Sequence, residues 1–192
     1  FGVTERAKSD GVGVLPCRSQ GGIGMMSLNL LVENPKDPVV WRGPVIAGAV
    51  KQFWSDVSWG DVDVMFVDMP PGTGDVPLTV FQSLPISGVV VVTSPQDLVS
   101  LIVEKAIRMA EMMKVPVLGM VENMSVFKCP DCGKEHRIFG GDGSGALAAA
   151  HGIAATAALP IDPAFAMSVD SGTIESVDTS ALKAVVDAAV GK

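Results

Sequence analysis

Apolar residues occur in short uninterrupted runs that are separated by segments with helical periodicity. The runs at 64–67, 88–93 and 115–121 are each bounded by polar or turn-forming residues. Runs of this kind predict strands that are buried on both faces, as in a parallel sheet covered by helices. Shorter stretches at 11–16 and 23–32 predict two more strands near the start of the chain.

Helical patterns fill most of the segments between these strands. One helix is expected to begin at Pro44, a second to cover 76–84 and a third to cover 97–113. After them the pattern predicts a small Ala-rich helix, a short strand and a last helix from about Thr179. Strands and helices that alternate in this way predict an α/β fold with a doubly wound, mainly parallel sheet, in a single domain over residues 1–192.

Composition narrows the class of protein. Apolar residues make up 48% of the 192 residues, which favours a globular domain. The 14 basic and 21 acidic residues give a net charge of −7, so we expect no nucleic-acid partner. No apolar run approaches the roughly 18–20 residues of a membrane span, so we expect no membrane partner. Three cysteines do not form a disulfide framework, which indicates a reducing, cytoplasmic location.

The first candidate site follows the run at 64–67. Asp68 is expected at the carboxyl end of a parallel strand, the edge where open α/β sheets bind ligands. A carboxylate there suits a magnesium ion beside a phosphate. The loop at 70–74, Pro-Pro-Gly-Thr-Gly, has little side-chain bulk and allows backbone N–H groups to approach a phosphate. The alternative is an ordinary strand-to-helix turn in which the aspartate caps the next helix.

The second candidate site is the thiol pair Cys129 and Cys132, in an unusually long loop at about 124–145. Two thiolates at this spacing bind one metal, but a zinc site or an iron–sulfur cubane needs four ligands. Three completions stay open. His136 and Cys17 join the pair, the pair is a redox dithiol, or a second copy of the chain supplies two more thiolates. Zinc is the main rival to a cluster.

A glycine-rich segment near the start of the chain needs a separate interpretation. Residues 20–27 superficially resemble a phosphate-binding loop, but they lack its lysine and lead into apolar residues instead of following a strand. We therefore interpret them as structural. The chain begins with Phe1 and not with Met, and it reads as a piece of something longer.

Five motifs that follow one another between residues 41 and 133 resemble the Mrp/ApbC family of iron–sulfur cluster carrier P-loop ATPases, a branch of the MinD/ParA class. The motifs are Trp41-Arg42-Gly43-Pro44, Asp68-Met69-Pro70-Pro71-Gly72-Thr73-Gly74-Asp75, Thr93-Ser94-Pro95-Gln96-Asp97, Val121-Glu122-Asn123-Met124-Ser125 and Cys129-Pro130-Asp131-Cys132-Gly133. The resemblance implies a homodimeric ATPase that uses ATP and Mg²⁺, binds a 4Fe–4S cluster across its two-fold axis and passes it to apo iron–sulfur proteins.

The resemblance also implies roles for single residues. Asp68 matches the aspartate that holds magnesium through water. The segment 70–75 matches the switch that senses the γ-phosphate, with Gly72 and Asp75 expected to act in hydrolysis and Pro70 and Gly72 to contact the nucleotide. Asn123 matches the residue that reads adenine, and Pro160 is expected beside it. Cys129 and Cys132 match the bridging cluster ligands, and a closed two-fold axis turns two ligands into four.

One part of the family pattern is missing. The phosphate loop with its two lysines belongs upstream of Phe1, so we expect the complete protein to hydrolyse ATP and this segment alone to be inactive. Two other functions stay open, a non-enzymatic metal-binding scaffold and a MinD/ParA-type positioning ATPase. The thiol pair and the lack of an amphipathic C-terminal helix count against the positioning ATPase.

Overall fold

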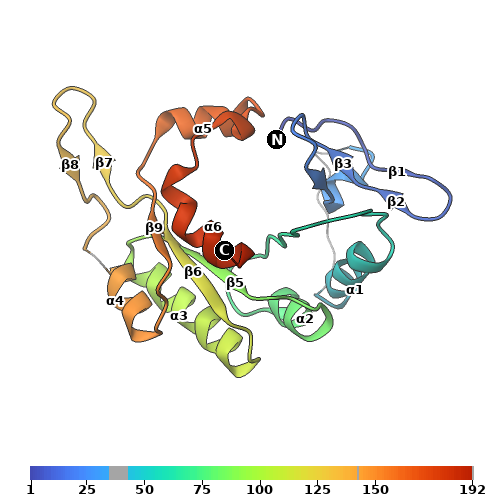
Figure 1. Cartoon of the computed structure of the whole chain (residues 1–192), viewed down its shortest axis with the longest axis horizontal. Coiled ribbons are helices and arrows are strands. Elements are labelled where there is room, and N and C mark those ends of the chain that lie inside the picture. Colours follow the sequence, from blue (N-terminus) through green and yellow to red (C-terminus); the bar gives the residue numbers. More distant parts are fainter. Residues whose placement is uncertain (35–42, 142, 192) are drawn as a thin grey trace.

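A three-stranded parallel sheet forms the centre of the folded chain. The computed structural model describes residues 1–34, 43–141 and 143–191. The strands lie in the order β5-β6-β9, and their bounds are Val89–Thr93, Val117–Glu122 and Thr156–Ala158 (Figure 1). The expected strands at 88–93 and 115–121 are thus confirmed, the second beginning two residues later than predicted.

Helices cover both faces of this sheet, as the doubly wound prediction requires. On one face Met120 of β6 packs against Ile107 in α3 (Asp97–Met112) and Ala148 in α4 (Gly143–Ala150), all buried. The neighbouring Gly119 points to the other face. There Val185 of α6 (Lys183–Val190) lies 2.9 Å from the position that a Cβ on Gly119 would take. A side chain at residue 119 would therefore push α6 off the sheet.

The first part of the chain forms small antiparallel ribbons instead of strands of the main sheet. Its elements are β1 (Lys8–Ser9), β2 (Val14–Leu15), β3 (Cys17–Arg18), β4 (Gly24–Met25), the 3-10 helix η1 (Leu28–Leu30), α1 (Gly43–Ser55) and α2 (Asp75–Ser83). β1 pairs with β2 and β3 pairs with β4. The helix expected at 76–84 is confirmed as α2. Trp41 and Arg42 lie outside the described residues.

The two strands expected at 11–16 and 23–32 are therefore wrong in extent. Asp10 turns the chain before β2, because its carboxylate accepts hydrogen bonds from the N–H groups of Val12 and Gly13, each at 2.8 Å. The second run is interrupted at Ser27, whose hydroxyl caps η1. Side-chain hydrogen bonds of this kind compete with strand pairing.

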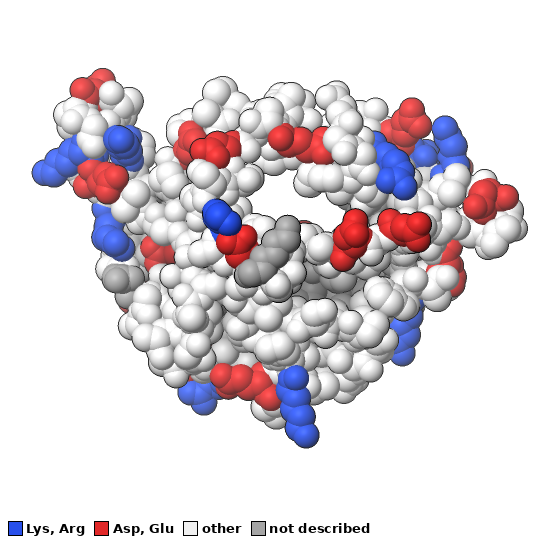
Figure 2. Space-filling model, viewed as in Figure 1, with Lys and Arg blue, Asp and Glu red and all other residues white. Residues whose placement is uncertain are grey.

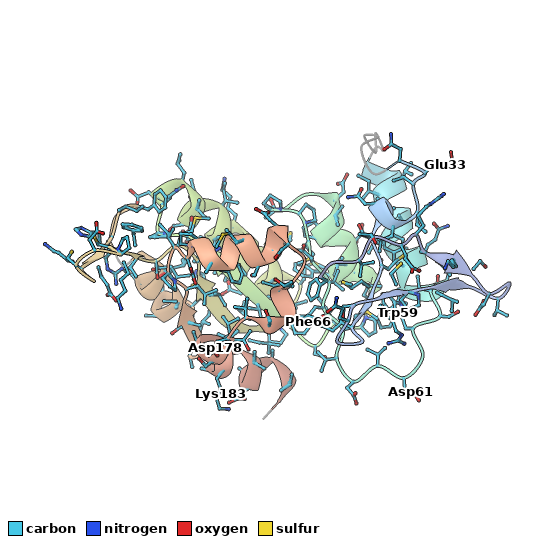
Figure 3. All side chains as sticks on the ribbon, turned by 90° about the horizontal axis from the view of Figure 1, so that it is seen from above. Glu33, Trp59, Asp61, Phe66, Asp178 and Lys183 are labelled. Atoms are coloured by element: carbon cyan, nitrogen blue, oxygen red, sulfur yellow. The ribbon has the colours of Figure 1, made fainter. Side chains whose placement is uncertain are left out.

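The strand expected at 64–67 is also wrong. Residues 61–74 carry no helix or strand, and Val64 and Phe66 expose 47% and 76% of their surface. Within the described residues nothing pairs with this segment, and β5 is an edge strand with one open side. Phe66 lies in the middle of the molecule, between the carboxyl-terminal helices and the N-terminal strands (Figure 3). An apolar run becomes a strand only where a neighbouring strand supplies hydrogen bonds, and no such neighbour lies beside 64–67.

The remaining elements lie within the long loop or follow it. They are the hairpin strands β7 (Phe127–Lys128) and β8 (Glu135–His136), the helix α5 (Pro163–Asp170) and the 3-10 helices η2 (Ile174–Ser176) and η3 (Ser180–Leu182). α5 was not predicted; it begins where the Asp162 carboxylate caps the Ala164 N–H at 2.8 Å. η3 and α6 confirm the expected last helix. No helix in the described ranges is long and apolar enough to cross a membrane.

Contacts between the two ends of the chain close the molecule into a ring. Glu175 of η2 accepts hydrogen bonds from the Ser19 hydroxyl at 2.7 Å and from the Gly21 N–H at 3.0 Å. Figure 2 shows the opening that this ring surrounds.

Candidate functional site

The thiol pair lies at the tip of the β7–β8 hairpin, which projects from one corner of the molecule (Figure 1). The Cys129 N–H donates to the Lys134 carbonyl and the Gly133 N–H donates to the Cys129 carbonyl, both at 2.9 Å. Gly133 has a φ of 71°, the left-handed conformation that a residue without a Cβ adopts at little cost. This tight turn holds both cysteines at the end of a short, well-bonded hairpin.

The same turn prepares Cys129 to act as a ligand. The backbone N–H groups of Cys132 and Asp131, together with the Cys132 thiol, lower the pKa of Cys129 below its ordinary value. Hydrogen bonds to a sulfur favour the thiolate, which is the form that binds metal. Cys132 is exposed and Cys129 half-buried, so both are open to a partner at the surface.

The structure does not complete a metal site within the chain. In the described ranges no group of three or more His, Cys, Asp or Glu side chains is placed to hold a metal ion. Cys17 lies in β3, where its thiol contacts the Glu5 carbonyl at 3.4 Å. His136 lies in β8, exposed on the hairpin itself. The pair therefore offers two ligands, and neither Cys17 nor His136 joins it in a cluster of three.

The base of the hairpin is firmly attached to the sheet. Both the N–H and the hydroxyl of Ser125 donate to the Leu159 carbonyl, at 2.9 and 3.0 Å. The Ile161 N–H donates to the Val126 carbonyl at 2.8 Å. The hairpin thus leaves the sheet from a fixed junction between the end of β6 and the end of β9.

A buried carboxylate, missed as a site residue in the sequence, closes this junction. Glu122 is 6% exposed and Ser144 is 8% exposed, and the Ser144 hydroxyl donates to the Glu122 carboxylate. Because Glu122 ends β6 and Ser144 lies in the first turn of α4, this bond joins the two ends of the loop that carries the hairpin. The sequence did contain a signal for this residue, because a glutamate at the end of an apolar strand is rarely buried unless it is paired.

Asn123 and Pro160 both lie next to this junction, directly after β6 and shortly after β9. The Asn123 N–H donates to the Thr93 carbonyl at 2.8 Å, which fixes it beside the end of β5. Pro160 lines a cavity of about 880 Å³ together with Glu122 and Ser125. Asn123 follows the end of β6, in a turn, and it is not among the residues that line this cavity. The two predicted nucleotide residues do not share this cavity.

The segment with the predicted magnesium ligand is exposed. Asp68, Pro70 and Asp75 are all accessible, and Gly72 adopts a φ of 88°. Asp75 lies in the first turn of α2 and the N-cap is Gly74, so Asp68 does not cap this helix. In the parts of the chain that the structure describes, no hydrogen bond or ion pair joins this segment to Asn123 or Pro160.

Comparison with known proteins places this architecture in a class. A solved nucleotide-binding protein from Archaeoglobus fulgidus, in complex with ADP, matches 90% of this chain with a TM-score of 0.76 and 38% sequence identity, over 67% of its own length. The sheet with helices on both faces is thus the fold of a P-loop NTPase. The prediction of that fold class is confirmed.

The family follows from the sequence comparison. The family model described as "ParA: NUBPL iron-transfer P-loop NTPase" matches residues 1–191, and the chain belongs to this family. An iron-sulfur cluster carrier protein of Methanocaldococcus jannaschii is 44% identical over 78% of this chain and 52% of its own length. One of Clostridium perfringens is 40% identical over 91% of this chain and 64% of its own length. The chain thus spans between about half and two thirds of these relatives.

Proposed function

We propose that this chain is part of an ATP-dependent iron–sulfur cluster carrier that works as a homodimer and passes a 4Fe–4S cluster to apo-proteins. The observation that carries the proposal is the hairpin tip, with two accessible thiols, a lowered Cys129 pKa and no third ligand gathered beside them in the described residues. A second copy related by a two-fold axis supplies the two missing thiolates. The names of the relatives agree with such cargo.

The position of the pair suits a carrier better than a storage site. A cluster held at a projecting tip is reached from several sides and leaves without unfolding the sheet. The carrier is proposed to act in the cytoplasm, where reducing conditions keep surface thiols unpaired. All three cysteines of the chain are free thiols.

ATP binding and hydrolysis belong to the same proposal, for a protein as long as its relatives. Asp68 and Asp75 carry exposed carboxylates, which are the hard oxygen donors that suit Mg²⁺. When bound, the ion neutralises charge on the transferring phosphoryl group. Gly72 and Pro70 allow the backbone of this loop to approach a γ-phosphate, while Asn123 and Pro160 are proposed to contact the adenine end.

Anaerobic reconstitution with iron and sulfide tests the cluster. We expect about two irons per chain in a dimer, a loss in Cys129→Ala and Cys132→Ala, and no loss in the matched control Cys17→Ala. Four irons in a monomer, or a cluster that needs Cys17 or His136, would contradict the bridging site. Tightly bound zinc without iron uptake would favour a metal-binding scaffold.

Two measurements test the nucleotide site. Calorimetric titration of this 192-residue chain with Mg-ATP is expected to show weak or no binding, and micromolar affinity would contradict that expectation. In a protein extended to the length of its relatives, Asp68→Asn is expected to abolish most hydrolysis while the circular dichroism stays unchanged. Turnover near that of the unsubstituted protein would show that Asp68 does not serve the metal.

A further inference from the structure

Basic side chains gather on the hairpin that carries the thiol pair. Lys128, Lys134 and Arg137 are all exposed, and within the described residues none of them takes part in an ion pair. Figure 2 shows blue side chains together with red ones on the projecting arm, and mostly red side chains around the central opening. Glu135 is the cross-strand neighbour of Lys128, but it forms no ion pair with it in the described residues, so all three basic groups can still pair with a partner's carboxylates.

The net charge of the hairpin segment, residues 126–139, is opposite in sign to the net charge of the rest of the protein. Residues 126–139 contain three basic and two acidic side chains, and the other residues contain 11 basic and 19 acidic ones. The hairpin segment is therefore slightly positive while the remainder carries −8. At physiological salt, screening limits the interaction of exposed charges to about 8 Å, so a molecule that approaches the hairpin responds chiefly to the charges nearest to it.

Apolar side chains lie next to these charges. Ile138 and Phe139 come directly after Arg137 and expose 56% and 36% of their surface. Exposed apolar residues beside arginine and lysine are a common composition for a protein interface, because the apolar part supplies burial and the charges supply orientation. Lys128, Lys134, Arg137, Ile138 and Phe139 are called the hairpin patch below.

We propose that the hairpin patch is the docking surface for the recipient apo-protein, and that the recipient presents an acidic face to it. This inference rests on the proposed carrier function. A second copy of the chain is a poor occupant of the patch itself, since two patches in contact would bring like charges together. In the bridged dimer the tips meet through the cluster, and Arg137, Ile138 and Phe139 lie five to seven residues beyond Cys132 in the sequence.

Docking at this position brings the recipient to the cargo. The patch surrounds the two cysteines in sequence, from Lys128 immediately before the pair to Phe139 seven residues after it. A recipient bound there holds its own thiolates near the cluster, so exchange of ligands takes place within one complex. Complementary charge chiefly accelerates the encounter and selects the partner.

The experiment uses the apo form of an acidic 4Fe–4S ferredoxin as the probe. Transfer from the cluster-loaded carrier is followed by circular dichroism at low and at high salt. At low salt we expect the Lys134→Glu/Arg137→Glu variant to transfer about ten times more slowly than the unsubstituted carrier, because removal of charge steering lowers association rates by factors of 10 or more. At high salt the two rates are expected to converge. Lys105→Glu, which changes an exposed lysine of α3 far from the hairpin in the sequence, is the control and keeps most of the rate.

A binding measurement without a cluster separates this proposal from the function on which it rests. Fluorescently labelled apo-ferredoxin is titrated with the cluster-free carrier, and a basic protein of similar size is the charge-reversed control. Selective binding of the acidic probe, lost in the double variant, supports the patch even if reconstitution fails. Equal affinity of the double variant and the unsubstituted carrier, or an equal loss in Lys105→Glu, would overturn the docking surface while leaving the cluster site intact.

Discussion

The bond between Ser144 and Glu122 gives a prediction whose size follows from burial. Ser144→Ala removes the hydroxyl that donates to a carboxylate of which only 6% is exposed. A lost hydrogen bond to a buried charged group costs about 1.5–3 kcal/mol, because water cannot replace the missing donor. We therefore expect the free energy of unfolding to fall by about that amount.

The same substitution in a Glu122→Gln protein tests whether the loss of stability comes from the charge of the Glu122 carboxylate. In Glu122→Gln the bond to Ser144 is neutral, so the further change Ser144→Ala is expected to cost only about 0.5–1.5 kcal/mol. Urea unfolding, followed by tryptophan fluorescence and by circular dichroism, measures the free energy of unfolding of the unsubstituted protein, of the two single variants and of the double variant. Ser83→Ala, at an exposed serine in α2, is the matched control and is expected to change stability by less than about 0.5 kcal/mol.

If Ser144→Ala is as mild as Ser83→Ala, then Ser144 does not support the Glu122 carboxylate and the junction at the hairpin base does not depend on this pair. If the substitution costs the same in both backgrounds, the hydroxyl acts on something other than the carboxylate charge.

Three further predictions concern the core, the ring contact and the thiols. Ile107→Ala, at a residue with 0% exposure, is expected to lower the unfolding free energy by about 2–5 kcal/mol, measured by urea denaturation. Glu175, whose folded-state pKa is lowered chiefly by the Ser19 hydroxyl, contributes stability above its ordinary pKa of 4.5 and loses it as pH falls through the folded-state pKa. Glu175→Gln is therefore expected to flatten the acid limb of a stability–pH curve, and an unchanged limb would contradict this. Cys129, whose pKa is lowered chiefly by the Cys132 N–H, is expected to react with iodoacetamide at a lower pH than the same cysteine does in the urea-unfolded chain.

The sequence predicted the second half of the fold well because the local pattern and the tertiary environment agree there. β5, α3 and β6 are continuous in the chain, and each apolar run packs against an element that lies next to it in sequence. The segment 64–67 has an equally clear pattern, yet it stays unpaired. Its hydrogen bonds depend on a neighbouring strand, which a local pattern does not contain. The same limit explains the short ribbons near the start of the chain.

The candidate site was predictable in its chemistry and less so in its support. The spacing of Cys129 and Cys132 is enough by itself to indicate a pair of metal ligands. The hairpin turn that lowers the Cys129 pKa depends on backbone N–H positions, which the sequence does not specify. Glu122 was likewise visible only as part of a motif, because its partner Ser144 lies 22 residues away.

The unpaired segment at 64–67 and the open side of β5 have a practical consequence for anyone who handles this chain. An exposed apolar segment and a free sheet edge both offer unsatisfied N–H and C=O groups, which form a template for strands of other molecules. The chain is therefore expected to aggregate in solution as its concentration rises. A charged residue in such a segment opposes this pairing, so Phe66→Lys, at a side chain with 76% exposure, is the substitution that should keep the protein dispersed without touching its core.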